Sequence, residues 1–139
     1  MEIVRSISIE RPVGEVFEFV ADPRNDPRWC AKVRSVEPAG DGRYAVVHKP
    51  VPGKPERQME MTRVAYEPPR RIGWREEDGV DVFDVTYELE DLGGRTHFTQ
   101  RSVAELGSSR LLRPLYRAGI GRDVAKQLKE LRKLLEASS

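Results

Sequence analysis

The chain has 139 residues, of which 38% are hydrophobic and 34% are charged, and its formal net charge is +1. This length is typical of one domain and no Ser/Gly-rich linker divides the sequence, so we expect a single domain over residues 1–139. Because the positive and negative charges nearly cancel, no large single-sign field draws the chain to nucleic acid or to an anionic membrane surface.

The sequence contains one cysteine, Cys30, and two widely separated histidines. This excludes an intrachain disulfide and argues against a metal site, and no cofactor is predicted. Charged residues interrupt the amino-terminal segment, so no apolar run there has the length of a signal peptide or a membrane span. We therefore expect a cytoplasmic protein without membrane insertion.

The amino-terminal part of the chain predicts one strand and two short helices. Isoleucines recur at a period of two in residues 2–10, which predicts a half-buried strand. Apolar residues then follow at helical spacing, which predicts a short helix over residues 12–21. Residues 24–31, which lie among prolines, are predicted to form a second short helix or turn with Trp29 as its apolar anchor.

Turn residues recur between positions 33 and 104 and separate five or six β-like runs, which predicts an antiparallel meander. After Gly107 the pattern becomes helical, and one amphipathic helix is predicted to begin near Leu111 and to close the chain. At 1.5 Å per residue its length of about 35 Å is enough to cross a sheet. The apolar stripe of this helix consists of Leu112, Tyr116, Ile120, Val124, Leu128, Leu131 and Leu135.

Two hairpins predict which face of the sheet is buried. A two-residue loop at Asp78-Gly79 pairs Trp74 with Phe83, and a two-residue loop at Gly93-Gly94 pairs Tyr87 with Gln100. Both registers place one mostly apolar set on the inner face: Ile72, Trp74, Glu76, Asp81, Phe83, Val85, Tyr87, Leu89, Phe98, Gln100 and Ser102. The polar members of this set need partners, water or a ligand, which favours a cavity under the helix.

Several segments carry a resemblance to a known family: Ser6-Ile7-Ser8-Ile9, Arg11-Pro12-Val13-Gly14-Glu15-Val16-Phe17, Asp22-Pro23 with Pro27-Arg28-Trp29, Tyr87-Glu88-Leu89-Glu90, Gly93-Gly94-Arg95-Thr96 and the leucine-rich terminal helix. With this order of elements, the chain resembles the SRPBCC superfamily, also called START-like or birch-pollen-allergen-like helix-grip proteins, and specifically its polyketide cyclase/dehydrase branch. The resemblance implies an α+β fold, in which a curved antiparallel sheet of six or seven strands wraps around a long C-terminal helix, with two short helices after the first strand. It also implies a hydrophobic cavity between sheet and helix.

Aromatic and thioether side chains with a few polar groups are typical of a small-molecule pocket. The candidate cavity residues are Met59, Met61, Trp74, Phe83, Val85, Tyr87, Phe98, Gln100, Ser102, Leu112 and Tyr116. Glu76 and Asp81 are catalytic candidates that we expect opposite one another, solvated at the cavity rim. Tyr87 is a further candidate, and Arg63 joins them if a four-residue turn at Glu67–Arg70 directs it inward.

The two histidines are weaker candidates. The second hairpin places His97 on the outer face, opposite Glu90. The face of His48 depends on the loop length at Gly40-Asp41-Gly42, and we prefer a placement toward solvent. Cys30, next to Trp29, has no basic triad around it and no partner thiol, so we interpret it as a packing cysteine.

The leading hypothesis is a monomer or weak homodimer that binds a small hydrophobic molecule, such as a polyketide, lipid or quinone. The alternative is an aromatase/cyclase or dehydratase that uses cavity carboxylates or a tyrosine to move protons. A second alternative is an adaptor that docks a partner protein on the outer face of the sheet. That face lacks the aromatic anchors common in binding hot spots.

Overall fold

The computed structural model describes residues 1–50, 55–107, 111 and 113–137. Its elements are β1 (Glu2–Ile9), α1 (Val13–Val20), the 3-10 helix η1 (Pro23–Asn25), α2 (Asp26–Trp29), β2 (Val33–Gly40), β3 (Arg43–His48), β4 (Arg57–Glu67), β5 (Arg71–Glu77), β6 (Val82–Asp91), β7 (Thr96–Glu105) and α3 (Arg113–Ala137). They follow the predicted order, and the long helix begins two residues later than expected.

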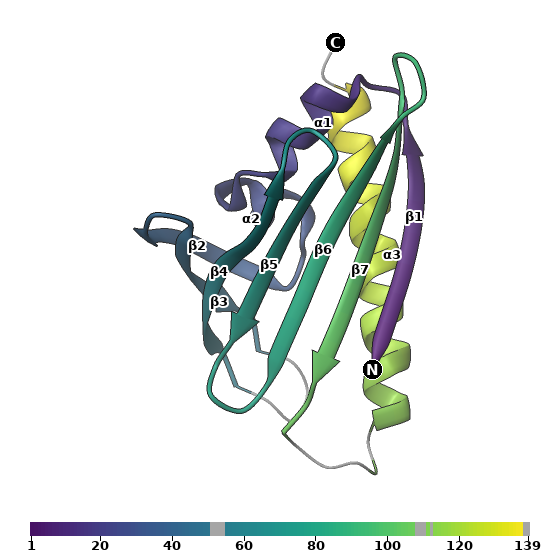
Figure 1. Ribbon diagram of the computed structural model, residues 1–139. Coiled ribbons are helices and arrows are strands. Elements are labelled where there is room, and N and C mark those ends of the chain that lie inside the picture. The colour runs from purple at the N-terminus through teal and green to yellow at the C-terminus, as the bar shows by residue number, and fades with distance from the viewer. Residues whose placement is uncertain (51–54, 108–110, 112, 138–139) are drawn as a thin grey trace.

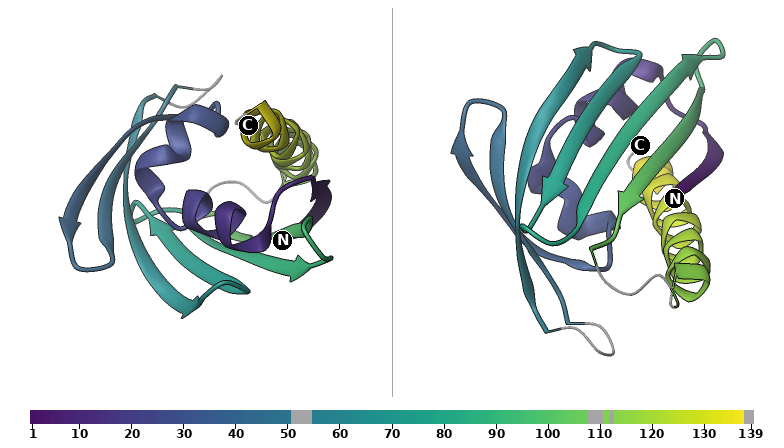
Figure 2. Two further views of the ribbon diagram at one scale, coloured as in Figure 1. Left: turned by 90° about the horizontal axis from the view of Figure 1, so that it is seen from above. Right: turned by 60° about the horizontal axis from the view of Figure 1, so that its bottom comes forward.

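All strands join one seven-stranded antiparallel sheet in the order β1-β7-β6-β5-β4-β3-β2 (Figure 1). The sheet is curved, and the helices lie on its concave side (Figure 2, left). α3 runs alongside β1, while α1 and α2 occupy the remaining space inside the curve. The predicted α+β helix-grip fold is confirmed.

The core forms where the predicted apolar stripe of α3 meets the inner face of the sheet. The stripe residues of its C-terminal half are buried: Val124, Leu128, Leu131 and Leu135. Tyr116 and Ile120 are half-buried, and Leu112 lies outside the described residues. Arg11 holds the end of the helix, because its guanidinium donates hydrogen bonds to the carbonyls of Leu135 (2.8 Å) and Glu136 (3.3 Å).

The register of the second hairpin is confirmed, since Tyr87 pairs with Gln100 and Leu89 with Phe98. The predicted register at Asp78-Gly79 is wrong by two residues, because Trp74 pairs with Val85. The loop is longer because the Asp78 carboxylate accepts hydrogen bonds from the backbone N–H groups of Val80 (2.9 Å) and Asp81 (2.7 Å).

Side chains alternate between the two faces of a strand, so an even shift preserves the predicted inner face. Trp74, Phe83 and Tyr87 all point into the curve and are buried. Within the described part of the chain, no helix is long and apolar enough to cross a bilayer.

Candidate functional site

A small cavity of about 40 Å³ lies between the sheet, α2 and α3. This is room for a few water molecules. Its lining is Asp26, Cys30, Lys32, Val33, Met61, Trp74, Glu76, Phe83, Val85, Tyr87, Gln100, Ser102, Ile120, Val124 and Gln127. Most of the candidate cavity residues are among these. Of the others, Met59 and Phe98 are buried without lining the cavity, and Tyr116 is half-buried on α3.

A larger hollow of about 550 Å³, which we call the groove, opens at the surface between α2, the end of β3 and α3. It is lined by Pro27, Arg28, Trp29, Ala31, Lys32, Lys49, Pro50, Asp123, Lys126, Gln127 and Glu130. Lys32 and Gln127 line both the groove and the cavity. These two side chains therefore stand between the surface and the interior.

The cavity-lining rings of Tyr87 and Trp74 contact further aromatic rings that do not themselves line the cavity. The ring centroid of Tyr87 lies 5.7 Å from that of Trp29 and 5.3 Å from that of Phe98. Tyr44 contacts Trp74 edge-on, with 5.8 Å between centroids. Contacts of this kind hold bulky side chains in fixed orientations, so the rings of Tyr87 and Trp74 give the cavity a largely apolar aromatic wall.

A buried hydrogen-bond chain links α3 to the sheet. Gln127 Nε2 donates to Gln100 Oε1 at 2.8 Å, and Gln100 Nε2 lies 3.3 Å from Ser102 Oγ. Gln127 was not among the predicted site residues, because a polar residue beside the apolar stripe of an amphipathic helix is ordinarily solvated. Gln127 lies next to Val124 and Leu128 on the buried face of α3, and this position could have indicated that its side chain is buried.

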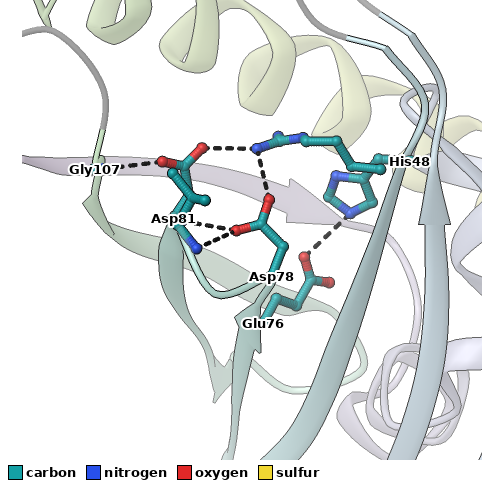
Figure 3. Close-up of polar contacts among 7 residues, drawn as sticks. His48, Glu76, Asp78, Asp81 and Gly107 are labelled. Carbon is teal, nitrogen blue, oxygen red and sulfur yellow. Dashed lines mark hydrogen bonds and ion pairs between the residues drawn. The ribbon is translucent and has the colours of Figure 1, made fainter.

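His48 lies inside the molecule, which contradicts the preferred placement toward solvent. Its Nε2 is 3.2 Å from Glu76 Oε2, and the two side chains are 3% and 10% exposed (Figure 3). Gly40 pairs with Arg43, so the loop has two residues and His48 falls on the inner face with Val46. The pattern of β3 could not decide this, because apolar residues occupy both of its faces.

The buried carboxylate of Glu76 stays ionised. Burial pushes its pKa upward, but the contact with His48 and the charges of His48, Lys32 and Arg57 outweigh that effect. The pKa of Glu76 is therefore below its usual value of 4.5. The two partners are within ion-pair distance, although His48 Nε2 forms no well-aligned hydrogen bond with any described residue.

Asp81 has a structural partner and does not face Glu76, which overturns the expected pair at a solvated rim. It is 1% exposed, and its carboxylate accepts hydrogen bonds from Arg57 (2.7 Å) and from the backbone N–H of Gly107 (3.0 Å) (Figure 3). Arg57 also lies 3.6 Å from Asp78. Glu76 instead pairs with Phe83 across the strands, as the two-residue shift of the register requires.

Asp26, which was not among the predicted site residues, lines the cavity and is 5% exposed. Its Oδ1 atom has no hydrogen-bond partner among the described residues. Burial raises its pKa well above 3.8, and the carboxylates of Glu76 and Asp22 raise it further. Residues three apart in a helix lie on the same side, and Asp26 and Trp29 are three apart in α2. The prediction that Trp29 points inward therefore also implied that Asp26 points inward.

The two cavity carboxyl groups thus favour opposite protonation states. Burial also raises the pKa of the Tyr87 phenol and of the Cys30 thiol well above their usual values. The cavity therefore combines one ionised carboxylate, Glu76, with neutral hydrogen-bonding groups at Asp26, Tyr87 and Cys30.

These opposite pKa directions predict opposite effects of pH on two variants. Ionised Glu76 stabilises the fold above its usual pKa of 4.5, and this contribution is lost as pH falls through the lower native pKa. We expect Glu76→Gln to lower the free energy of unfolding near neutral pH and to have little effect in acid.

Protonated Asp26 stabilises the fold below its usual pKa of 3.8, and that contribution is lost as pH rises through the higher native pKa. Asp26→Asn removes this loss, so we expect it to gain stability relative to the unaltered protein as pH rises. Urea unfolding over a pH series measures both variants. If the change in free energy of unfolding had the same dependence on pH in both variants, these pKa directions would be contradicted.

The remaining candidates lie outside the cavity. Arg63 pairs with Trp74 in register, but its side chain is exposed and lies over the ring of Tyr66, 4.4 Å from the centroid. His97 pairs with Glu90 on the outer face, as predicted. The charged residues of that face pair with one another, as in Arg75–Asp84 (2.9 Å), Arg101–Glu2 (3.3 Å) and Arg101–Glu88 (3.5 Å).

Solved structures share this fold at low sequence identity. A START superfamily protein from Mycobacterium smegmatis has a TM-score of 0.83 at 11% identity, covering 99% of each chain. A protein from Thermus thermophilus has a TM-score of 0.79 at 22% identity, covering 100% of each chain. The Zhui aromatase/cyclase from a Streptomyces species has a TM-score of 0.78 at 16% identity, covering 98% of this chain and 93% of that one.

No curated protein matches the chain by sequence. The family model described as polyketide cyclase/dehydrase and lipid transport matches residues 1–136. This match covers almost the whole chain and confirms the resemblance found in the sequence. The chain belongs to the polyketide cyclase/dehydrase and lipid transport family.

Proposed function

We propose that the protein binds a small, mainly apolar molecule between the sheet and α3, with a polyketide, a lipid or a quinone as the candidate classes. The observation that carries the proposal is a cavity that combines the aromatic side chains of Trp74, Phe83 and Tyr87 with a buried carboxyl, Asp26, whose Oδ1 atom has no hydrogen-bond partner among the described residues. Pockets for small organic ligands are usually built from apolar walls and a few orienting polar groups.

Binding requires the groove and the cavity to become one space. The cavity volume of about 40 Å³ is far below the roughly 300–1,000 Å³ typical of ligand pockets, whereas the groove of about 550 Å³ is within that range. A shift of Lys32 and Gln127, which line both hollows, would open a path between them. Such a shift exchanges the bond between Gln127 and Gln100 for contacts with the ligand.

Filling the cavity with a side chain tests this proposal. We expect Ser102→Leu to weaken binding of a neutral probe, 2-acetylnaphthalene, about tenfold or more, because the new side chain occupies space that the ligand needs. Binding is followed by tryptophan fluorescence, since Trp29 lines the groove and Trp74 lines the cavity.

Ser6→Leu is the matched control, because Ser6 is exposed on the outer face of β1. It should leave the affinity unchanged. Unfolding curves for both variants exclude global damage as the cause of any loss. Equal affinity of the Ser102→Leu variant and the unaltered protein would place the probe elsewhere and overturn the proposal.

A second candidate, an aromatase/cyclase or dehydratase, is favoured by the two cavity carboxyl groups. Two such groups whose environments push their pKa values apart are the usual arrangement for an acid and a base. Here Asp26 would donate a proton and Glu76 would accept one, with Tyr87 as a further donor. Incubation with a poly-β-ketone mimic separates an enzyme from a simple binder, since only an enzyme produces a new aromatic absorbance.

A further inference from the structure

The groove and the cavity differ in how their charged residues are partnered. Four basic residues line the groove against two acidic ones: Arg28, Lys32, Lys49 and Lys126 against Asp123 and Glu130. In the cavity, the ionised carboxylate of Glu76 lies within ion-pair distance of His48 and near the charges of Lys32 and Arg57. Positive charge therefore predominates in the groove, whereas the charged group of the cavity already has partners.

The basic side chains of the groove are available to a ligand. None of the four forms an ion pair with another residue in the described part of the chain. Arg28 lies over the ring of Phe19 (5.1 Å to the centroid), and Lys32 lies over the ring of Phe83 (5.4 Å). Lys49 and Lys126 are exposed, so their ammonium groups can move to meet an anion.

The groove also has an apolar side. Beside the basic residues it is lined by Pro27, Trp29 and Pro50. The ring of Trp29 also contacts the ring of Tyr87, which lines the cavity, so the apolar side of the groove leads toward the interior. A ligand that matches this surface has a charged end and an apolar body. In the cavity, the carboxylate of Glu76 already has His48 and the charges of Lys32 and Arg57 around it, so no free positive charge is left there, among the described residues, for an anion. The charged end of the ligand therefore stays in the groove.

From this juxtaposition we propose that the ligand is an amphiphilic anion, held with its carboxylate or phosphate at Lys49 and Lys126 and its apolar body directed toward the cavity. This inference rests on the proposed function and specifies the ligand class and its orientation. Exposed charge pairs are individually weak, so the two lysines together strengthen binding by about fivefold to twentyfold.

Three probes of one ring system test the inference by titration calorimetry: 2-naphthamide, which is neutral, and the anions 2-naphthoate and 2-naphthyl phosphate. We expect both anions to bind about fivefold to twentyfold more tightly than the amide at low ionic strength, with the preference reduced by added salt. A preference for only one anion identifies a carboxylate or a phosphate as the natural charged group.

Reversing the charge of single residues shows which side chains cause the preference for anions. Lys49→Glu and Lys126→Glu should each remove most of the preference for the anions while leaving the affinity for 2-naphthamide nearly unchanged. Arg132→Glu makes the same change in net charge on α3 at an exposed position that does not line the groove, and it should preserve the preference.

The outcomes separate this inference from the proposed function. Equal affinity for the amide and the anions, or equal loss in all three charge variants, would overturn the anionic ligand class while leaving the binding function in place. Failure of all three probes to bind would overturn both. Unchanged or stronger binding of the anions in the Lys49→Glu and Lys126→Glu variants would show that these lysines do not hold the charged end, and would overturn the proposed orientation.

Discussion

Leu128→Ala is expected to lower the free energy of unfolding by about 2–5 kcal/mol, measured by urea denaturation. Leu128 is 2% exposed and packs at the centre of the helix-sheet core, so truncation loses its contacts and leaves a void. α3 covers the β1 side of the concave face and supplies Val124, Leu128, Leu131 and Leu135 to the core, so a chain ending at Gly107 should lose cooperative unfolding altogether.

Leu115 provides the control on the same helix. It is 71% exposed, so Leu115→Ala makes the same chemical change without removing buried surface and should change stability by no more than about 0.5 kcal/mol. Similar losses at the two positions would mean that α3 does not pack with the face described here. Cooperative unfolding of the truncated chain would contradict the architecture itself.

The second large effect is expected at Asp81. Asp81→Ala should cost roughly 2–4 kcal/mol, because it leaves the partly buried Arg57 and the backbone N–H of Gly107 without the carboxylate they share. Equilibrium unfolding near neutral pH measures this loss. The double variant Arg57→Met with Asp81→Leu should recover part of it, since the Arg57 charge is then removed together with its main partner, while Asp78 keeps its hydrogen bonds from backbone N–H groups.

Asp84 is the matched control for Asp81. It forms a bidentate pair with Arg75 at the surface, and the two side chains are 38% and 51% exposed. Exposed pairs contribute about 0.2–1 kcal/mol, so Asp84→Ala should be several times less harmful. Equal costs at the two aspartates would show that the cluster around Asp81 contributes no more than a surface ion pair.

Strand pairing was predictable wherever a short loop and an alternating pattern agreed. The Gly93-Gly94 turn was enough to place Tyr87 opposite Gln100. At Asp78-Gly79 the dipeptide was misleading, because the side chain of Asp78 built a longer loop. The prediction of which side chains face inward was still correct, because the register shifted by two residues and side chains alternate between the two faces with a period of two.

The polar part of the candidate site was less accessible to sequence reasoning. The partnership between His48 and Glu76 joins two strands that are not neighbours in the sheet, and no local pattern encodes such a contact. Burial of Asp26 depends on how α2 docks, and a carboxyl is ordinarily expected at the surface. Tertiary packing determines where these polar side chains lie, whereas the alternation of apolar and polar residues along each strand determines where the apolar ones lie.

The place of β1 at the edge of the sheet affects how the chain can fold during its synthesis. Its neighbour in the sheet is β7, and the contact between Ser6 and Thr99 spans 93 residues. At roughly 5–20 residues per second, translation leaves β1 without its partner for about 5–20 seconds. During that interval its isoleucines are exposed to chaperones and proteases, and ribosome-bound chains stalled before residue 96 would allow this exposure to be measured. The first strand to be synthesised, β1, is thus among the last to pair with its neighbour in the sheet.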